Sequence, residues 1–311
     1  MNQDSLEFTV QSSGQRLDMA ILRHLGDRMS RSQLQALISD GAVRVDGRRR
    51  KAGERLKGGE HIVLQLPLPD NTPGVLPESI PLQVIHEDDC LVVIDKPAGM
   101  VVHPGDHNER GTLVAAALSR WPQLAAMPGE AKRAGVVHRL DKDTSGLILL
   151  ALQDSARRHL MRQFQERRVA KRYLALLERC PPARQGAIDA PVGRDPRRRQ
   201  RMAVIARGKN AVSDYRVLEG NLAGGRALVE VRPTTGRTHQ IRVHMAHIGC
   251  PVVADNVYGI RKQRLPLARQ FLHASGLSFT HPTTLEEVSF ESPLPAELQT
   301  LLNDLRTACY G

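Results

Sequence analysis

The feature that most limits how this chain can fold is a group of closely spaced prolines in its N-terminal third. They recur every two to four residues, at Pro67, Pro69, Pro73, Pro77 and Pro81. Proline lacks a backbone N–H and fixes φ, so such a stretch cannot continue a helix or enter the centre of a sheet. It predicts a semi-rigid linker over residues 71–82, between a small domain over residues 14–70 and a large domain over residues 83–311.

The chain carries an excess of positive charge. Its 311 residues include 44 Lys and Arg against 33 Asp and Glu, which gives a formal net charge of +11 and an isoelectric point near 10.0. This excess favours a polyanionic partner, and nucleic acid is favoured over a membrane because no basic amphipathic helix with bulky apolar residues stands out. Aromatic residues make up only 3%, too few for single-strand binding by base stacking alone.

Other bulk features argue against a membrane-spanning, secreted or zinc-ribbon protein. No run of about 18 apolar residues occurs, and the first ten residues lack the apolar core of a secretory signal. The four cysteines are scattered and form no CxxC pair: Cys90, Cys180, Cys250 and Cys309. This pattern excludes a disulfide scaffold and fits the reducing cytoplasm.

The small domain alternates short helical and strand patterns. Apolar residues at helical spacing predict a helix over 16–25, and Ser30 is a candidate N-cap for a second helix over 31–39. Alternation predicts strands over 42–45 and 61–66, the first followed by an Asp-Gly turn. Between residues 16 and 57 there are 11 basic and 5 acidic residues, which favours contact with phosphates.

Four segments of this domain resemble the S4 RNA-binding domain: residues 14–18, 30–33, 37–47 and 58–62. In that family two helices and a small sheet present basic side chains to structured RNA. The resemblance therefore implies a small α/β domain that binds RNA and contributes no chemistry. The residues expected to contact RNA are Arg16, Arg31, Ser32, Arg48, Arg49, Arg50 and Lys51.

The large domain has the pattern of an α+β fold, without the regular βαβ alternation of a Rossmann chain. Strands are expected over 91–94, 147–151, 173–177, 227–231 and 288–290, and helices over 112–121, 154–167, 238–247 and 295–306. Neither GxGxxG nor GxxxxGK[ST] occurs, which argues against a nucleotide cofactor.

Two segments of the large domain concentrate reactive side chains. Residues 136–146 (VVHRLDKDTSG) place two carboxylates, two cations, two hydroxyls and a histidine between apolar runs. Residues 234–247 place His239 and Arg242 on one face of a predicted helix, and Ile241 and Met245 on its apolar face.

These segments are compatible with several kinds of site. The first can be read as a capped turn with a surface aspartate. A zinc site is disfavoured because there is no HExxH arrangement, and a nuclease because no group of carboxylates could hold magnesium. An aspartate that acts on a glycosidic bond fits better.

Four ordered blocks of the large domain resemble the RluA/RluD family of pseudouridine synthases. They cover residues 94–105, residues 138–146 with the family's HRLDxxTSG signature, residues 171–176, and residues 236–249. Residues 272–274 and 281–282 match the family's C-terminal strands, and the whole resemblance spans about residues 14 to 306. Asp95 replaces a common asparagine and Ala254 a usual glycine, with no loss of chemistry expected.

The resemblance implies a mixed or antiparallel-sheet catalytic domain that converts uridine in RNA to pseudouridine, its C-glycoside isomer. Asp141 would attack C1′ or assist removal of the 2′ proton, Arg242 would keep Asp141 charged, and Tyr173 would line the pocket and help remove the proton from C5. Further substrate contacts are expected from Lys96, His103, His138, Arg139, Thr144, Arg237, His239 and Gln240.

The S4-like domain and His103-Pro104-Gly105 favour the RluD-like branch, which acts on large-subunit ribosomal RNA. We therefore expect a cytoplasmic, monomeric isomerase acting on ribosomal RNA or a pre-ribosomal particle, with no metal, cofactor or membrane partner. Three alternatives are a non-catalytic S4-type RNA-binding or ribosome assembly factor, an RNA N-glycosidase that releases uracil, and a pseudouridine synthase acting on transfer RNA.

Overall fold

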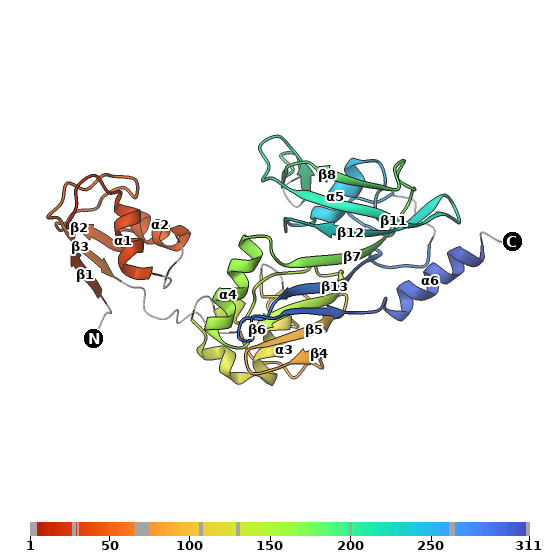
Figure 1. Ribbon diagram of the computed structural model, residues 1–311, viewed down its shortest axis with the longest axis horizontal. Helices are drawn as coiled ribbons and strands as arrows, with labels where there is room; N and C mark the ends of the chain where they lie inside the picture. Colours follow the sequence, from red (N-terminus) through yellow and green to blue (C-terminus); the bar gives the residue numbers. More distant parts are fainter. Residues whose placement is uncertain are drawn as a thin grey trace. The chain divides into compact units, whose positions relative to one another are not determined.

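The computed structural model describes residues 5–26, 29, 31–65, 75–105, 108–128, 131–198, 201–260 and 265–308, apart from the side chains of residues 32 and 33. The chain divides into two units, Met1–Thr72 and Pro73–Gly311 (Figure 1). Each unit has hydrophobic clusters of its own. No helix in the described ranges is long and apolar enough to cross a membrane.

The first unit packs two helices on a three-stranded antiparallel sheet. Its elements are β1 (Ser5–Thr9), α1 (Leu17–Leu25), α2 (Arg31–Asp40), β2 (Val43–Val45) and β3 (His61–Gln65), with sheet order β1-β3-β2. The two predicted helices are confirmed to within a residue at each end. The candidate N-cap Ser30 and the end of the second predicted strand, at Leu66, lie outside the described residues.

A tight turn after β2 displays the basic cluster of this unit. Asp46 and Gly47 both have left-handed backbone angles, with φ of 48° and 75°, which suits an Asp-Gly pair in a primed turn. Val45 and Arg48 exchange two backbone hydrogen bonds across it. Residues 48–51 leave this turn as a fully exposed basic run.

The second unit is built on one mixed nine-stranded sheet with order β4-β5-β6-β13-β7-β12-β11-β8, in which β14 also pairs with β13. Its strands are β4 (Gln83–Glu87), β5 (Leu91–Lys96), β6 (Ser145–Ala151), β7 (Ala170–Leu177), β8 (Gln185–Asp189), β11 (Val212–Leu222), β12 (Arg226–Pro233), β13 (Leu272–Thr280) and β14 (Glu287–Glu291). A separate hairpin joins β9 (Val192–Arg194) and β10 (Met202–Val204). The helices are α3 (Leu113–Arg120), α4 (Asp154–Gln165), α5 (Gln240–His247) and α6 (Ala296–Thr307), with 3-10 turns η2 (Pro122–Ala126) and η3 (Ala131–Arg133).

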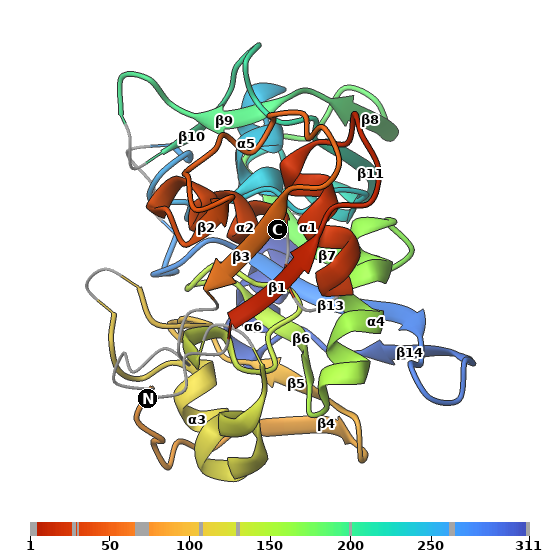
Figure 2. The ribbon, with the colours of Figure 1, turned by 90° about the vertical axis from the view of Figure 1, so that its left-hand side faces the viewer.

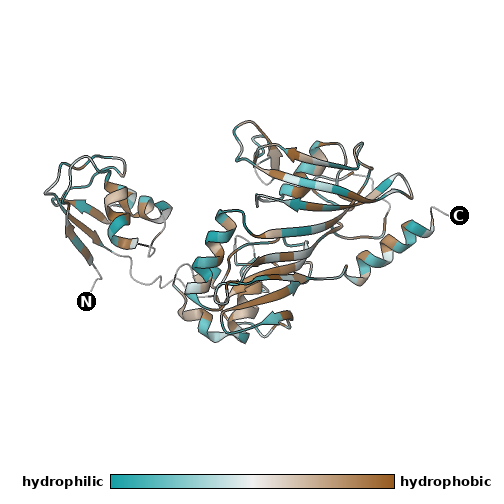
Figure 3. Cartoon of the chain, in the orientation of Figure 1, coloured by the Kyte–Doolittle hydropathy of each residue, from teal (hydrophilic) through white to brown (hydrophobic). Residues whose placement is uncertain are grey.

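Helices cover both faces of this sheet. On β5 and β6, alternate residues such as Val92 and Ile148 pack with α3, whereas their neighbours Val93 and Leu149 pack with α4 (Figure 2). Both strands are therefore apolar almost throughout (Figure 3), as expected for strands buried on two sides. Beyond β13, α5 packs on one face of β7 and β12 and α6 on the other. The α+β class and mixed sheet are thus confirmed.

The central strand β6 meets β13 in the sheet's parallel pairing, His273 opposite Ser145 and Ala274 opposite Gly146. A Cβ on Gly146 would lie 2.3 Å from the carbonyl oxygen of Ala274, and its φ of 111° also favours glycine. This close approach fixes the start of β6, directly after residues 141–144.

The predicted linker, residues 71–82, is described only from Val75 onward. From there Val75, Ile80 and Leu82 pack on the core beneath α3, and the backbone N–H of Glu78 donates to Ala115 O. Residues 75–82 are thus an extended arm attached to the second unit, because three apolar side chains alternate with the prolines.

We predict that Ile62→Ala lowers the free energy of unfolding of the first unit by about 2–5 kcal/mol, because it leaves a cavity in that unit's core. Urea denaturation should show an earlier transition for this unit and an unchanged transition for the second. The exposed substitution Lys57→Ala is the control. A shift of both transitions together would show that the two cores unfold as one.

Candidate active site

A cavity of about 550 Å³ opens in the second unit. Its wall comes from four segments: residues 137–144 before β6, the C-terminal half of α4, the start of β7, and residues 233–242, which lead into α5. The two segments singled out in the sequence, about 100 residues apart, therefore face the same cavity.

Arg242 joins two carboxylates at the base of this cavity. Its Nη1 donates to Asp141 Oδ2 at 3.0 Å, while Nε and Nη2 donate to the two oxygens of Asp255 at 2.6 and 2.9 Å. Arg242 and Asp255 are buried, and the Asp141 side chain is 17% exposed. Asp141 and Arg242 line the cavity, so Asp141 is the carboxylate of this ion triad that reaches it.

Asp255 holds Arg242 in place. Its Oδ1 also accepts the backbone N–H groups of Val257 and Tyr258, both at 2.9 Å. Burial would raise the pKa of Asp255, but hydrogen bonds and charge attraction from Arg242 lower it overall. Burial would lower the pKa of Arg242, yet its two carboxylate partners raise it overall. Arg242 and Asp255 can therefore stay charged in a largely dry site.

His239 lies beside Asp141, with Nε2 3.9 Å from Oδ1. It adopts a left-handed backbone conformation (φ 56°) just before α5, and its Nδ1 lies 2.8 Å from the Tyr258 hydroxyl. That hydroxyl also accepts the N–H of Met202. Burial lowers the pKa of His239, so a neutral imidazole borders the carboxylate at neutral pH.

Tyr173 and Lys171 point to the cavity from the same face of β7, as residues two apart in a strand do. Burial, with a smaller contribution from Asp141, raises the pKa of Tyr173. Its hydroxyl is therefore protonated at neutral pH, and its role in removing the C5 proton stays a prediction. Burial lowers the pKa of Lys171 to about 8, and its Nζ donates to Thr235 O at 3.2 Å.

His138 forms another part of the wall. Its Nε2 accepts the backbone N–H of Leu149 at 2.9 Å, and its ring stacks on Phe164 of α4 with centroids 4.8 Å apart. Burial lowers the pKa of His138 from an ordinary 6.5 to about 3. It is thus a neutral aromatic surface. Arg139, Thr144 and Arg237, all expected to contact substrate, also line the cavity.

Lys96, expected to bind substrate, is instead fully buried and is not part of the cavity wall. Its Nζ donates to the carbonyl oxygens of Pro97, Met100 and Lys142 at 2.7, 2.9 and 3.0 Å. Burial lowers the pKa of Lys96 to about 7. All three ammonium donors are used on backbone, so Lys96 supports the loop next to Asp141 rather than touching substrate.

Gln240 and His103 also differ from expectation. Gln240 lines the cavity, but its Oε1 accepts from the Thr235 hydroxyl and the Arg237 N–H, and its Nε2 donates to Val212 O and Ser213 Oγ. An amide has four hydrogen-bonding positions and all are filled, so Gln240 shapes the loop before α5. His103 is not in the cavity wall.

In the first unit, the predicted RNA contacts fall into two groups. Arg16 and Arg31 are half exposed, and both donate to the fully buried carboxylate of Asp18. The Arg16 hydrogen bond is the main reason that the pKa of Asp18 falls to about 2. Residues 48–51 are exposed, and Arg50 pairs with Glu54. The side chain of Ser32 lies outside the described residues.

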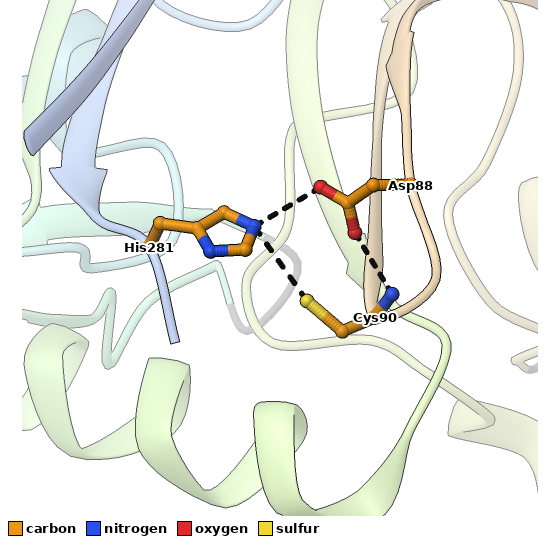
Figure 4. Close-up of side chains that lie close together, drawn as sticks. All are labelled: Asp88, Cys90 and His281. Carbon is orange, nitrogen blue, oxygen red and sulfur yellow. Dashed lines mark hydrogen bonds and ion pairs between the residues drawn. The ribbon is translucent and has the colours of Figure 1, made fainter. Parts of the chain in front are cut away.

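A second cluster joins Asp88, Cys90 and His281 at the other end of β5 (Figure 4). His281 Nδ1 accepts the backbone N–H groups of Thr283 and Thr284, so Nε2 carries the proton and donates to Asp88 Oδ2 at 3.0 Å. A metal would need the Nε2 lone pair of His281, which this proton occupies. It would also need a thiolate at Cys90, and burial raises the pKa of that thiol to about 11. We interpret this cluster as a hydrogen-bonded brace between two strand ends.

Comparison with known proteins agrees with this geometry. A family model described as RNA pseudouridylate synthase matches residues 90–247, and an S4 domain model matches residues 15–62. The chain belongs to the RNA pseudouridylate synthase family. It is therefore an isomerase with an N-terminal S4 domain.

The resemblance to individual proteins extends over nearly the whole chain. The synthase is 48% identical over 294 residues to an uncharacterized RNA pseudouridine synthase of Chloroflexus aurantiacus, covering 94% of this chain and 91% of that one. It is 43% identical over 316 residues to ribosomal large subunit pseudouridine synthase D of Nitrosomonas europaea, covering 98% and 89%. The solved structure of human RNA pseudouridylate synthase domain containing 1 is similar at 30% identity and a TM-score of 0.58, covering 75% and 96%.

Sequence reasoning missed two side chains of this site in the synthase. Asp255 lies in the segment 254–259, in which the sequence pattern singles out only Ala254, in place of a usual glycine. Lys171 stands two residues before Tyr173, and strand alternation could have placed both on one face. No sequence pattern paired Asp255 with Arg242, because the chain between them leaves helix α5 after His247 and continues through irregular turns that have no period.

We predict that Asp255→Asn weakens both stability and turnover. The neutral amide leaves a buried guanidinium short of one carboxylate, which should lower the free energy of unfolding by about 3–5 kcal/mol. The single-turnover rate should fall because Arg242 loses its orientation. Asp214→Asn, at an exposed position of β11, is the matched control. Unchanged melting and rate in the Asp255 variant would contradict the ion triad.

We predict that His138 makes the synthase less stable in acid. The folded protein keeps His138 neutral down to about pH 3, whereas the unfolded chain binds a proton near pH 6.5. Stability is therefore lost as pH falls through this interval. Between pH 7 and 5 the difference in unfolding free energy between wild type and His138→Gln should change by about 2 kcal/mol. A pH-independent difference in urea denaturation would refute this.

Proposed function

We propose that this synthase converts uridines of large-subunit ribosomal RNA to pseudouridine, with Asp141 as the catalytic carboxylate. The observation that carries the proposal is the Arg242–Asp141 ion pair at the base of a cavity of about 550 Å³. A volume of this order accepts a small-molecule-sized group. A uridine rotated out of an RNA stack is such a group.

The two oxygens of Asp141 have different surroundings. Oδ2 accepts the hydrogen bond of Arg242, whereas Oδ1 is 3.9 Å from His239 Nε2. Arg242 fixes the direction of the carboxylate, so Oδ1 is the oxygen available to the ribose. From there it can attack C1′ or accept the 2′ proton. In both routes the C1′–N1 bond breaks, the uracil turns, and C5 bonds to C1′ as the carboxylate leaves C1′ or the 2′ proton returns; C5 then loses its proton and N1 gains one.

The cavity wall accounts for the rest of the chemistry. The rings of Tyr173 and His138 and the side chain of Phe164 offer a surface on which uracil can turn. Lys171 and Arg139 bring positive charge to the same cavity, which suits an RNA phosphate or the charge that uracil carries when it leaves. Reactant and product have the same composition and oxidation state, so the reaction as proposed needs no cofactor.

The choice of ribosomal RNA rests on two observations. Relatives above 40% identity over almost the whole chain are named for the ribosomal large subunit, and the first unit displays an exposed basic cluster at residues 48–51. We propose that this unit anchors structured RNA of a pre-ribosomal particle in the cytoplasm. We propose that the synthase acts as a monomer.

We predict that Asp141→Asn abolishes pseudouridine formation while leaving RNA affinity within about twofold, because the amide keeps the shape but cannot act as nucleophile or base. Purified protein is incubated with large-subunit ribosomal RNA and with transfer RNA, and pseudouridine and free uracil are measured. Pseudouridine only in ribosomal RNA, lost in the variant, is the expected result.

Other outcomes select among the alternatives. Free uracil without pseudouridine would show that the protein is an N-glycosidase. Pseudouridine in transfer RNA alone would show that the substrate is transfer RNA and not ribosomal RNA. Full activity of Asp141→Asn would remove Asp141 from the mechanism. Mapping pseudouridines in ribosomal RNA from cells with and without the gene then identifies the uridines.

A further inference from the structure

The residues that follow Asp141 are held by two neighbouring side chains from the segment before β13. Arg269 Nη1 donates to the carbonyl oxygen of Asp143 at 3.2 Å, and Nη2 donates to Ser145 Oγ at 3.2 Å. Gln270 Nε2 donates to Thr144 Oγ1 at 3.3 Å. Three consecutive residues directly after Lys142 thus contact one short segment about 125 residues away in sequence.

Arg269 is 7% exposed, so its charge needs a partner. Nε and Nη2 reach one oxygen of Glu297 at 2.8 and 2.7 Å. Glu297 lies in the first turn of α6 and is 54% exposed. The guanidinium is therefore a link of fixed geometry between the C-terminal helix and the loop that carries Asp141.

The loop has a second support on its other side. Lys96 Nζ binds the carbonyl oxygen of Lys142, and Arg242 binds the Asp141 side chain. Residues 141, 142 and 143 are each tied to a different buried basic side chain. Arg269 differs from the other two because its counter-ion is on a surface helix, and because both Arg269 and Glu297 lie beyond residue 247, where the match to the synthase model ends.

We propose that Arg269, oriented by Glu297, is a positioning residue that sets the direction of the Asp141 carboxylate. Neither residue lines the cavity, so neither touches substrate. A shift of about 1 Å in a reacting group can cost about 100-fold in rate, and a carbonyl hydrogen bond two residues away restricts such a shift. This inference rests on the proposed role of Asp141.

The test compares single-turnover rates at saturating ribosomal RNA, RNA dissociation constants and melting temperatures. Arg269→Gln should lower the rate by about 10- to 100-fold, and Glu297→Gln by about 3- to 10-fold, with the dissociation constant within about twofold of wild type. The Arg269→Gln/Glu297→Gln double variant should be no slower than Arg269→Gln alone, because both act through one guanidinium.

Glu219→Gln is the matched control. Glu219 holds Arg306 of the same helix to β11 in an ion pair whose arginine is more exposed, 38% against 8% for Arg269, and it contacts no residue of the loop. It should leave the rate unchanged, whatever its effect on the melting temperature. If Arg269→Gln does not fold, the half-exposed Glu297→Gln still decides the matter.

Rates within twofold of wild type for Glu297→Gln, or an equal loss in Glu219→Gln, would overturn the inference. A rate loss that matches a rise in the RNA dissociation constant would also overturn it, since it would indicate a binding defect. An inactive wild type or an active Asp141→Asn would instead refute the proposed function. The two failures are therefore separate.

Discussion

The active site depends on a single buried guanidinium shared by two carboxylates. Arg242 donates from Nε and Nη2 to Asp255 and from Nη1 alone to Asp141. Its orientation is therefore fixed mainly by Asp255. A buried arginine is tolerated only with its charge compensated and its donors filled. This requirement brings three distant segments together: the loop before β6, helix α5, and the turn at residues 255–258.

Much of the frame of this site was readable from the sequence. The apolar stripe of Ile241 and Met245 predicted which side of α5 packs on the sheet, and that stripe left Arg242 on another side. The continuous apolar run of 147–151 is β6, buried on both faces. Periodicity predicts such elements because one repeating backbone geometry dictates which residues are buried.

What the sequence could not show is how polar groups divide their hydrogen bonds. Lys96 and Gln240 have the side chains of substrate contacts, yet three carbonyls occupy the first and four partners the second. Most of these partners come from turns with no periodicity, and Val212 and Ser213 come from the start of β11, 28 and 27 residues away from Gln240. Arg269 carried no signal for the same reason: its role depends on Glu297 and Asp143, 28 and 126 residues away.

The parallel pairing of β6 with β13 has a consequence for how the chain folds during its synthesis. During synthesis β6 leaves the ribosome more than a hundred residues before its partner at His273 and Ala274. Until then this strand, apolar except for Ser145, has an open edge, a site for wrong pairing in a nascent chain. Contacts of such long sequence separation also form late in folding. An enzyme of this design acquires its catalytic loop geometry only after residues 273–274 have been synthesised.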